Sequence, residues 1–188
     1  MERRLVGVTG APGAGKTTYA LRMVAESAAL AAYVPMDGFH LADVTLTALE
    51  RLDRKGAPDT FDAWGYAALL ARLRTETSHP VYAPGFERDL EQPVAGAVTV
   101  PAEAALVVTE GNYLLLDRPE WRAVRDHLDE VVFLVTDDEV RRRRLVARHV
   151  QFGKTQAEAE AWVARVDEGN AALVAATMDR ADRVVEIG

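Results

Sequence analysis

The stretch that decides the fold is Gly10-Ala11-Pro12-Gly13-Ala14-Gly15-Lys16-Thr17, which fits the pattern G-x-x-x-x-G-K-[ST] of a phosphate-binding loop. Glycines at these positions let backbone N–H groups turn inward around phosphate oxygens, where a Cβ would block the approach. Lys16 supplies a mobile positive charge for the outer phosphates, and Thr17 offers a hydroxyl to Mg²⁺. The predicted ATP-binding residues are Gly10, Ala11, Pro12, Gly13, Ala14, Gly15, Lys16, Thr17 and Thr18.

The segments on either side of the loop have the pattern that such a loop requires. Residues 5–9 read as a buried strand that enters it, and residues 18–30 read as a helix that leaves it. The N-terminus of that helix directs its positive dipole end toward the same anion. An ordinary glycine-rich turn is the alternative, and the two flanking segments argue against it.

Composition limits the classes of protein to which the chain can belong. Its 188 residues suit one domain over 1–188, with room for a small lid. A net charge of −7 argues against general binding to nucleic acid or to membrane surfaces, and the absence of cysteine excludes disulfides and thiolate chemistry. Without a long apolar run or room for a signal peptide before the first strand, we expect a cytoplasmic enzyme.

Two later strands end in acidic residues. The strand predicted at 32–36 runs into Asp37-Gly38-Phe39-His40, and the strand at 104–109 runs into Glu110. Because ligands bind at the carboxyl ends of strands in open α/β sheets, we expect Asp37 to be catalytic rather than only a helix cap. Glu110 is expected to join Thr17 at a Mg²⁺ site. For His40, packing and substrate contact remain equal alternatives.

Two irregular stretches are candidates for binding a second substrate. Lys55 and Asp59 lie in a Gly/Pro loop before the helix predicted at 63–74, which Asp62 would cap. Residues 79–101 lack helical periodicity and carry aromatic residues and Arg88, with a possible return strand at 97–100. A stretch of this length is usually functional or disordered, so we interpret it as a substrate-binding insertion. A surface hairpin is the alternative.

An arginine-rich helix follows the strand predicted at 131–135 and is expected to be capped by Asp137. Arg141, Arg144 and Arg148 are spaced three and four residues apart and share one helical face, whereas Arg142 and Arg143 are expected to be solvated. One interpretation is a lid over about 141–160 whose arginines close over the transferring phosphoryl group. The other is a charged, exposed helix.

The alternation of strands and helices predicts an α/β protein with a three-layer phosphate-loop NTPase fold. Its sheet is mostly parallel, with helices on both faces and a small helical lid. Further helices are predicted at 43–52, 119–128, 158–166 and 170–178, and a final strand at 183–187.

The order of these motifs resembles the phosphate-loop kinases of the uridine kinase, phosphoribulokinase and bacterial pantothenate kinase family. It is most similar to the small bacterial kinases labelled nucleoside/nucleotide kinase-like or fructose-transport-associated. The resemblance spans nearly the whole chain and rests on the loop with Asp37-Gly38-Phe39-His40, Pro58-Asp59-Thr60-Phe61-Asp62, Tyr82 with Arg88, Glu110-Gly111-Asn112-Tyr113 and the arginine helix.

This resemblance implies roles for single residues. Asp37 matches the aspartate that accepts the proton of the substrate hydroxyl, Glu110 matches the Mg²⁺-site acid, and Arg144 and Arg148 match lid arginines. The residues that would hold the acceptor are Asp37, His40, Asp59, Tyr82 and Arg88, and the predicted catalytic residues are Asp37, Lys16, Arg144 and Arg148.

The function expected from the resemblance is transfer of the γ-phosphoryl group of Mg-ATP to a hydroxyl of a small metabolite such as a sugar, a nucleoside or a pantothenate-like compound. Uridine kinases place a His and an Arg close together after a Tyr-Asp-Phe. Residues 82–88 lack that His, which leaves the acceptor open. A nucleotide-binding regulator and a GTPase-type switch are the alternatives, although no Asn-Lys-x-Asp motif is present. Monomer and homodimer both remain open.

Overall fold

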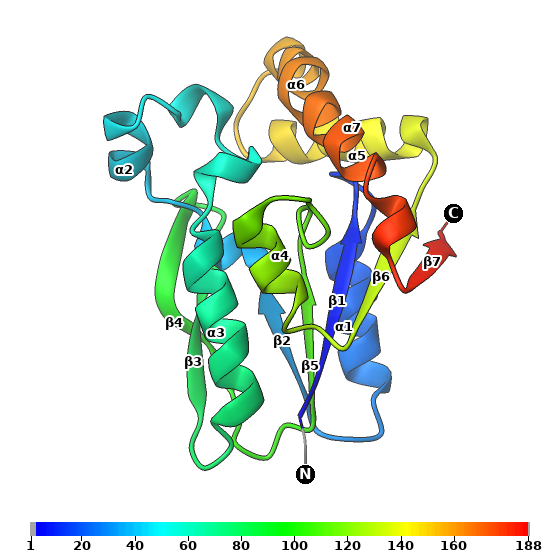
Figure 1. Cartoon of the computed structure of the whole chain (residues 1–188). Helices are drawn as coiled ribbons and strands as arrows, with labels where there is room; N and C mark the ends of the chain where they lie inside the picture. The colour runs from blue at the N-terminus through cyan, green and yellow to red at the C-terminus, as the bar shows by residue number, and fades with distance from the viewer. Residues whose placement is uncertain (1–2, 188) are drawn as a thin grey trace.

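The computed structural model describes residues 3–187, which form a parallel five-stranded sheet with helices on both faces (Figure 1). The strand order is β2 (Ala31–Pro35), β5 (Leu106–Glu110), β1 (Arg4–Gly10), β6 (Glu130–Val135) and β7 (Arg183–Glu186). The N-terminal strand β1 is thus central and β5 separates it from β2. Parallel pairing brings the carboxyl ends of β1, β2 and β5 to one edge. The predicted three-layer α/β class is confirmed.

Helices from different parts of the chain cover the two faces of the sheet. Helix α1 (Lys16–Glu26) covers one face, where Ala20 packs with apolar residues of β1, β5 and β6. Helices α3 (Ala63–Thr75) and α4 (Pro119–Arg125) cover the other face, in front of the sheet in Figure 1. This second layer holds the larger part of the buried apolar core, including Trp121 and Tyr66.

Local chemistry sets the helix ends. The side chain of Asp62 accepts from the Gly65 N–H at 2.8 Å, and that of Asp137 accepts from Glu139 and Val140, so both predicted N-caps are confirmed. Helix α1 ends at Glu26 rather than at residue 30. Helix α2 (Asp43–Ala48) is also shorter than predicted, because Glu50 adopts a left-handed φ of 55° that a helix cannot contain.

The stretch without helical periodicity is an antiparallel hairpin of β3 (Val81–Glu87) and β4 (Gln92–Val100), which forms its own two-stranded sheet. The hairpin packs directly on the 3₁₀ turn η1 (Met36–Phe39) that follows β2. A Cβ on Gly38 in that turn would lie 2.2 Å from the Pro84 carbonyl oxygen, so no other residue fits this contact. The hairpin is thereby held beside Asp37.

Residues 138–175 form a helical layer above the carboxyl edge of the sheet (Figure 1). It comprises α5 (Asp138–Gln151), a turn at 152–154, α6 (Gln156–Trp162), a π-helical turn η4 (Val163–Asp167) and α7 (Glu168–Ala175). The remaining elements are the short 3₁₀ turns η2 (Leu52–Arg54), η3 (Pro58–Thr60) and η5 (Met178–Arg180). Within residues 3–187, every helix is too short or too polar to span a lipid bilayer.

Candidate active site

A cavity of about 480 Å³ opens at the carboxyl edge of the sheet. Its walls come from the phosphate loop, η1, the loop around Lys55, the hairpin, the end of β5 and the C-terminal helices from α5 to α7. Segments far apart in the sequence therefore meet in one space large enough for small-molecule substrates.

The phosphate loop forms one end of the cavity. Of its predicted residues, those that line the cavity are Pro12, Gly13, Gly15, Lys16, Thr17 and Thr18. Gly10 and Ala11 instead present their carbonyl oxygens to the Lys16 ammonium, at 2.9 and 3.0 Å. Burial lowers the pKa of Lys16 to about 8, although the carboxylates of Glu110 and Asp37 oppose this shift. An anionic phosphate beside Lys16 would favour its charged form.

Thr17 and Glu110 lie together as the predicted metal site requires. The Thr17 hydroxyl donates to Glu110 Oε1 at 3.2 Å, and the Tyr33 hydroxyl donates to the same oxygen at 2.8 Å. Burial, with the nearby charge of Asp37, raises the pKa of Glu110. Tyr33 was not predicted as a site residue, because in the sequence it is only one aromatic residue in a strand.

The oxygen ligands at this end of the cavity fit Mg²⁺ that arrives with a nucleotide. Mg²⁺ is usually held by one or two carboxylates together with substrate phosphates and water. Thr17 and Glu110, which both line the cavity, supply such a partial set. Residues 3–187 contain no group of three or more His, Cys, Asp or Glu side chains that would hold a metal without a substrate.

Asp37 lines the cavity. Arg88 from the hairpin donates to Asp37 Oδ2 at 2.7 Å, which brings two predicted site residues into contact. Burial raises the pKa of Asp37, but the charges of protonated His40, of Arg88 and of two further cations outweigh it and lower the pKa below its usual value. The Asp37 side chain is therefore an ionised carboxylate at neutral pH.

His40 is packed beside Asp37 rather than free in the cavity. Its Nδ1 lies 2.8 Å from the Asp37 carbonyl oxygen, and its ring centroid lies 4.0 Å from that of Phe61 and 4.8 Å from that of Phe86. Burial lowers the pKa of His40. His40 lines the cavity as well, so both roles considered for it from sequence are compatible with its position.

Two predicted acceptor-binding residues do not reach the cavity. Asp59 is turned toward Arg51 and Arg54, with its Oδ2 3.4 Å and 2.8 Å from their guanidinium nitrogens. Tyr82 is 61% exposed, because alternation along β3 places Val81 and Ala83 inside and the residue between them outside. The expectation that Asp59 and Tyr82 converge with Arg88 near Asp37 was wrong for these two residues.

The same wall contains Lys55 and Phe86 instead. Lys55 Nζ donates to Asp43 Oδ1 at 2.6 Å and to the Glu91 carbonyl oxygen. The cationic groups of Lys55 and Arg88 lie 5.6 and 5.3 Å from the centroid of the Phe86 ring. An aromatic ring with two cations beside it thus faces the space next to Asp37.

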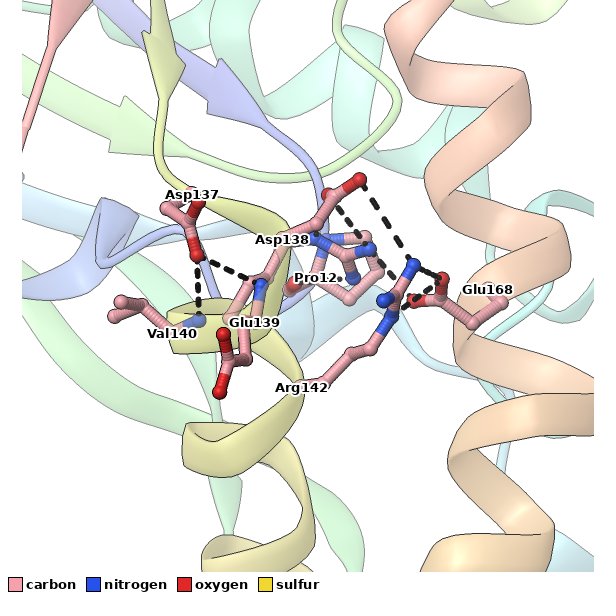
Figure 2. Close-up of polar contacts among 8 residues, drawn as sticks. Pro12, Asp137, Asp138, Glu139, Val140, Arg142 and Glu168 are labelled. Atoms are coloured by element: carbon pink, nitrogen blue, oxygen red, sulfur yellow. Dashed lines mark hydrogen bonds and ion pairs between the residues drawn. The ribbon is translucent and has the colours of Figure 1, made fainter.

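Only some of the arginines of α5 line the cavity. Arg144 and Arg148 line the cavity as predicted. Arg141 does not, because the helix turns it behind the phosphate loop, where its side chain is only 2% exposed. Arg142 is 51% exposed but is not simply solvated, since it pairs with Glu168 at 2.9 Å (Figure 2).

Comparison with known proteins agrees with this geometry. A family model described as the phosphoribulokinase / uridine kinase family matches residues 5–188. The chain belongs to this family. The uncharacterized protein YggC of Escherichia coli K12 is 34% identical to this kinase over 191 residues, which cover 98% of the kinase and 78% of YggC.

Two further relatives agree in sequence and in structure. A Schizosaccharomyces pombe protein named provisionally as a uridine kinase is 31% identical over 181 residues, which cover 90% of this kinase and 75% of the yeast protein. The crystal structure of a provisionally assigned fructose transport system kinase from Silicibacter sp. TM1040 superposes with a TM-score of 0.90 at 36% identity, covering 98% of this chain and 90% of that one. The predicted family and the kinase class are confirmed.

The side of the kinase cavity that is formed by the C-terminal helices contains polar residues that were not predicted. His149 Nε2 lies 2.9 Å from Asp167 Oδ2, and Asn170 donates to the Gly56 carbonyl oxygen at 3.5 Å. Asp167 and Asn170 are both 7% exposed and line the cavity. Buried polar residues on a helix would have been the only signal for them in the sequence, and the π-helical turn that directs Asp167 inward has no sequence signature.

Proposed function

We propose that this kinase transfers the γ-phosphoryl group of Mg-ATP to a hydroxyl of a small metabolite, with Asp37 as the general base. The observation that carries this proposal is the position of the Asp37 carboxylate. It shares one cavity with Lys16 of the phosphate loop and Arg148 of α5, and Arg88 of the hairpin donates to its Oδ2. Donor and acceptor groups can therefore be bound next to each other.

Each of these residues has a defined part in the transfer. Asp37 accepts a hydrogen bond from the acceptor hydroxyl, directs its oxygen toward the γ-phosphorus and takes the proton as the new P–O bond forms. The transition state is loose, so orientation and charge stabilisation matter more than early deprotonation. Lys16, Arg144 and Arg148 line the same cavity, and in this proposal they stabilise the charge on the transferring group and on the leaving ADP oxygen. Mg²⁺ bound with the nucleotide at Thr17 and Glu110 would neutralise phosphate charge.

The walls around Asp37 favour an acceptor with several polar groups. Lys55 and Arg88 supply cations next to the Phe86 ring, and Asp167 of η4 and Asn170 of α7 supply hydrogen-bonding groups. We infer a polyhydroxylated or weakly anionic acceptor, which includes sugars, nucleosides and pantothenate-like compounds. The names of the two relatives described above support testing a nucleoside and a sugar first.

A screen for ADP formation that depends on an added acceptor tests this proposal. Nucleosides, sugars, pantothenate and glycerate are each added to the protein with Mg-ATP, and the Asp37→Asn variant serves as the control. We expect one class of acceptor to raise ADP formation well above slow ATP hydrolysis in the wild type only. ATP hydrolysis that no acceptor stimulates, and that Asp37→Asn leaves unchanged, would instead favour a nucleotide-binding regulator or switch.

A further inference from the structure

Arg141 has an unusual environment for an arginine on a lid helix. Its guanidinium makes three contacts, with the Pro12 carbonyl oxygen at 3.3 Å, Glu168 Oε1 at 2.6 Å and Asp138 Oδ1 at 3.1 Å. Figure 2 labels these three partners, Pro12, Asp138 and Glu168, which lie close to one another. A fully buried cation is costly unless its donors are satisfied, and here the backbone of the phosphate loop is one of its three acceptors.

Helix α5 presses against the loop at the same point. A Cβ on Gly13 would lie 2.7 Å from the Arg141 carbonyl oxygen and 2.9 Å from Leu145 Cγ. Gly13 also has a left-handed φ of 81°. Both its backbone conformation and its neighbours therefore require glycine, and the helix that carries Arg141 is in direct contact with the phosphate loop.

The hydrogen bond from Arg141 to the Pro12 carbonyl determines the direction of the Gly13 N–H. The Pro12 carbonyl and the Gly13 N–H belong to one peptide unit, which is planar and trans, so they point in opposite directions. Gly13 lines the cavity and Arg141 does not. With the carbonyl turned back toward Arg141, the N–H is turned forward, toward the side where phosphate would bind.

The charge of Arg141 adds to this orientation. A cation that donates to a carbonyl oxygen polarises the whole peptide unit, so the N–H at its other end becomes a stronger donor. We propose that Arg141 is a positioning residue for the phosphoryl donor, which orients and polarises the Pro12–Gly13 peptide so that the Gly13 N–H binds a nucleotide phosphate. This inference rests on the nucleotide-binding part of the proposed function and is independent of the acceptor.

Arg142 provides a matched control for a purely structural role. Glu168 on α7 accepts from Arg141 through one oxygen and from Arg142 through the other, at 2.6 and 3.0 Å. Both arginines thus tie α5 to α7, but among the hydrogen bonds of residues 3–187 only that of Arg141 continues to Pro12. If the ion pair with Glu168 were all that mattered, both substitutions would have similar effects.

The test measures binding of two probes by isothermal titration calorimetry, Mg-ADP and inorganic tripolyphosphate with Mg²⁺. Tripolyphosphate has no base or sugar, so it reports on the phosphate loop alone. We expect Arg141→Gln to weaken both probes by about tenfold to a hundredfold, as for loss of a charge-assisted hydrogen bond. Arg141→Lys, which keeps the charge but cannot reach both Glu168 and Pro12, should weaken both by about tenfold. Arg142→Gln should change either affinity less than about twofold.

Thermal unfolding and amide NMR separate positioning from folding. A merely structural role would lower the melting temperature of Arg141→Lys without changing either affinity well below that temperature. The proton shift of the Gly13 amide should move in Arg141→Lys and not in Arg142→Gln. Wild-type affinity in a folded Arg141→Lys protein, or equal losses in the two glutamine variants, would overturn the inference. A wild-type protein that binds neither probe would instead overturn the proposed function.

Discussion

Substitution of Asp37 by Asn is the most direct test of the active site. The amide keeps the shape of the carboxylate but cannot accept a proton from the acceptor hydroxyl. We expect kcat for the best acceptor found in the screen to fall by about two to four orders of magnitude, the usual contribution of a positioned general base. At about 1.4 kcal/mol for each factor of ten, this corresponds to about 3 to 5.5 kcal/mol of the barrier.

The same substitution should have only a small effect on stability. It removes the ion pair in which Arg88 Nη2 lies 2.7 Å from Asp37 Oδ2. The two side chains are 29% and 40% exposed, so water screens the pair, and the loss should stay below about 1 kcal/mol of the free energy of unfolding. A large catalytic loss in a protein that unfolds at nearly the wild-type temperature is therefore the expected signature.

The assay follows kcat for Asp37→Asn over a Mg²⁺ titration, alongside direct measurement of ATP binding. We expect ATP affinity to change little and added Mg²⁺ to restore nothing. Asp59→Asn is the matched control, because Asp59 is held by Arg51 and Arg54 outside the cavity and its loss should change kcat less than about twofold. Recovery of kcat at high Mg²⁺ would refute the role as base and make Asp37 a metal-site residue.

Three further predictions concern other parts of the site. Lys16→Ala should lower kcat by at least about a hundredfold to a thousandfold, because a charge at the outer phosphates is lost; near-native turnover would contradict the assignment of the loop. Arg148→Lys should impair turnover nearly as much as Arg148→Ala, since lysine cannot make a bidentate phosphate contact. The control is Arg143→Ala, which should leave turnover unchanged because Arg143 is exposed. Equally small effects of the substitutions at Arg148 and Arg143 would favour an exposed helix without a phosphate contact. Because burial lowers the pKa of His40, the unfolded chain takes up this proton more readily, so the free energy of unfolding should fall as pH drops below about 6.5. Chemical denaturation at several pH values should show this fall to be smaller in His40→Gln, and an identical pH dependence would show that His40 does not titrate as inferred.

Much of the fold could be predicted because its signals are local. The phosphate loop, the buried strands and the side-chain caps at Asp62 and Asp137 are each determined within a few residues, and the structure contains all of them. The position of β5 between β1 and β2 could not be predicted. Strand order depends on pairing between residues about a hundred positions apart, for which one sequence carries no direct signal.

The candidate site shows the same division between local and long-range information. Asp37 and Glu110 could be predicted because each directly follows a strand whose carboxyl end lies at the ligand-binding edge. Arg141 was assigned to the same face as Arg144 and Arg148, which is right for the helix alone. The expectation that Arg141 faces the cavity was wrong, because its side chain is held by Pro12 and Glu168, which come from elements distant in the sequence.

The central position of β1 has a consequence for the order in which a growing chain can fold. Arg4 pairs with Leu106, so synthesis of the first partner strand is complete about 5 to 20 s after β1 at the usual rate of elongation. During that time β1, an apolar strand with both edges unpaired, is open to association with other chains. Its second partner, β6, is made later still. A chain that stops before β5 therefore carries the complete phosphate-loop sequence without any neighbouring strand to hold it in place.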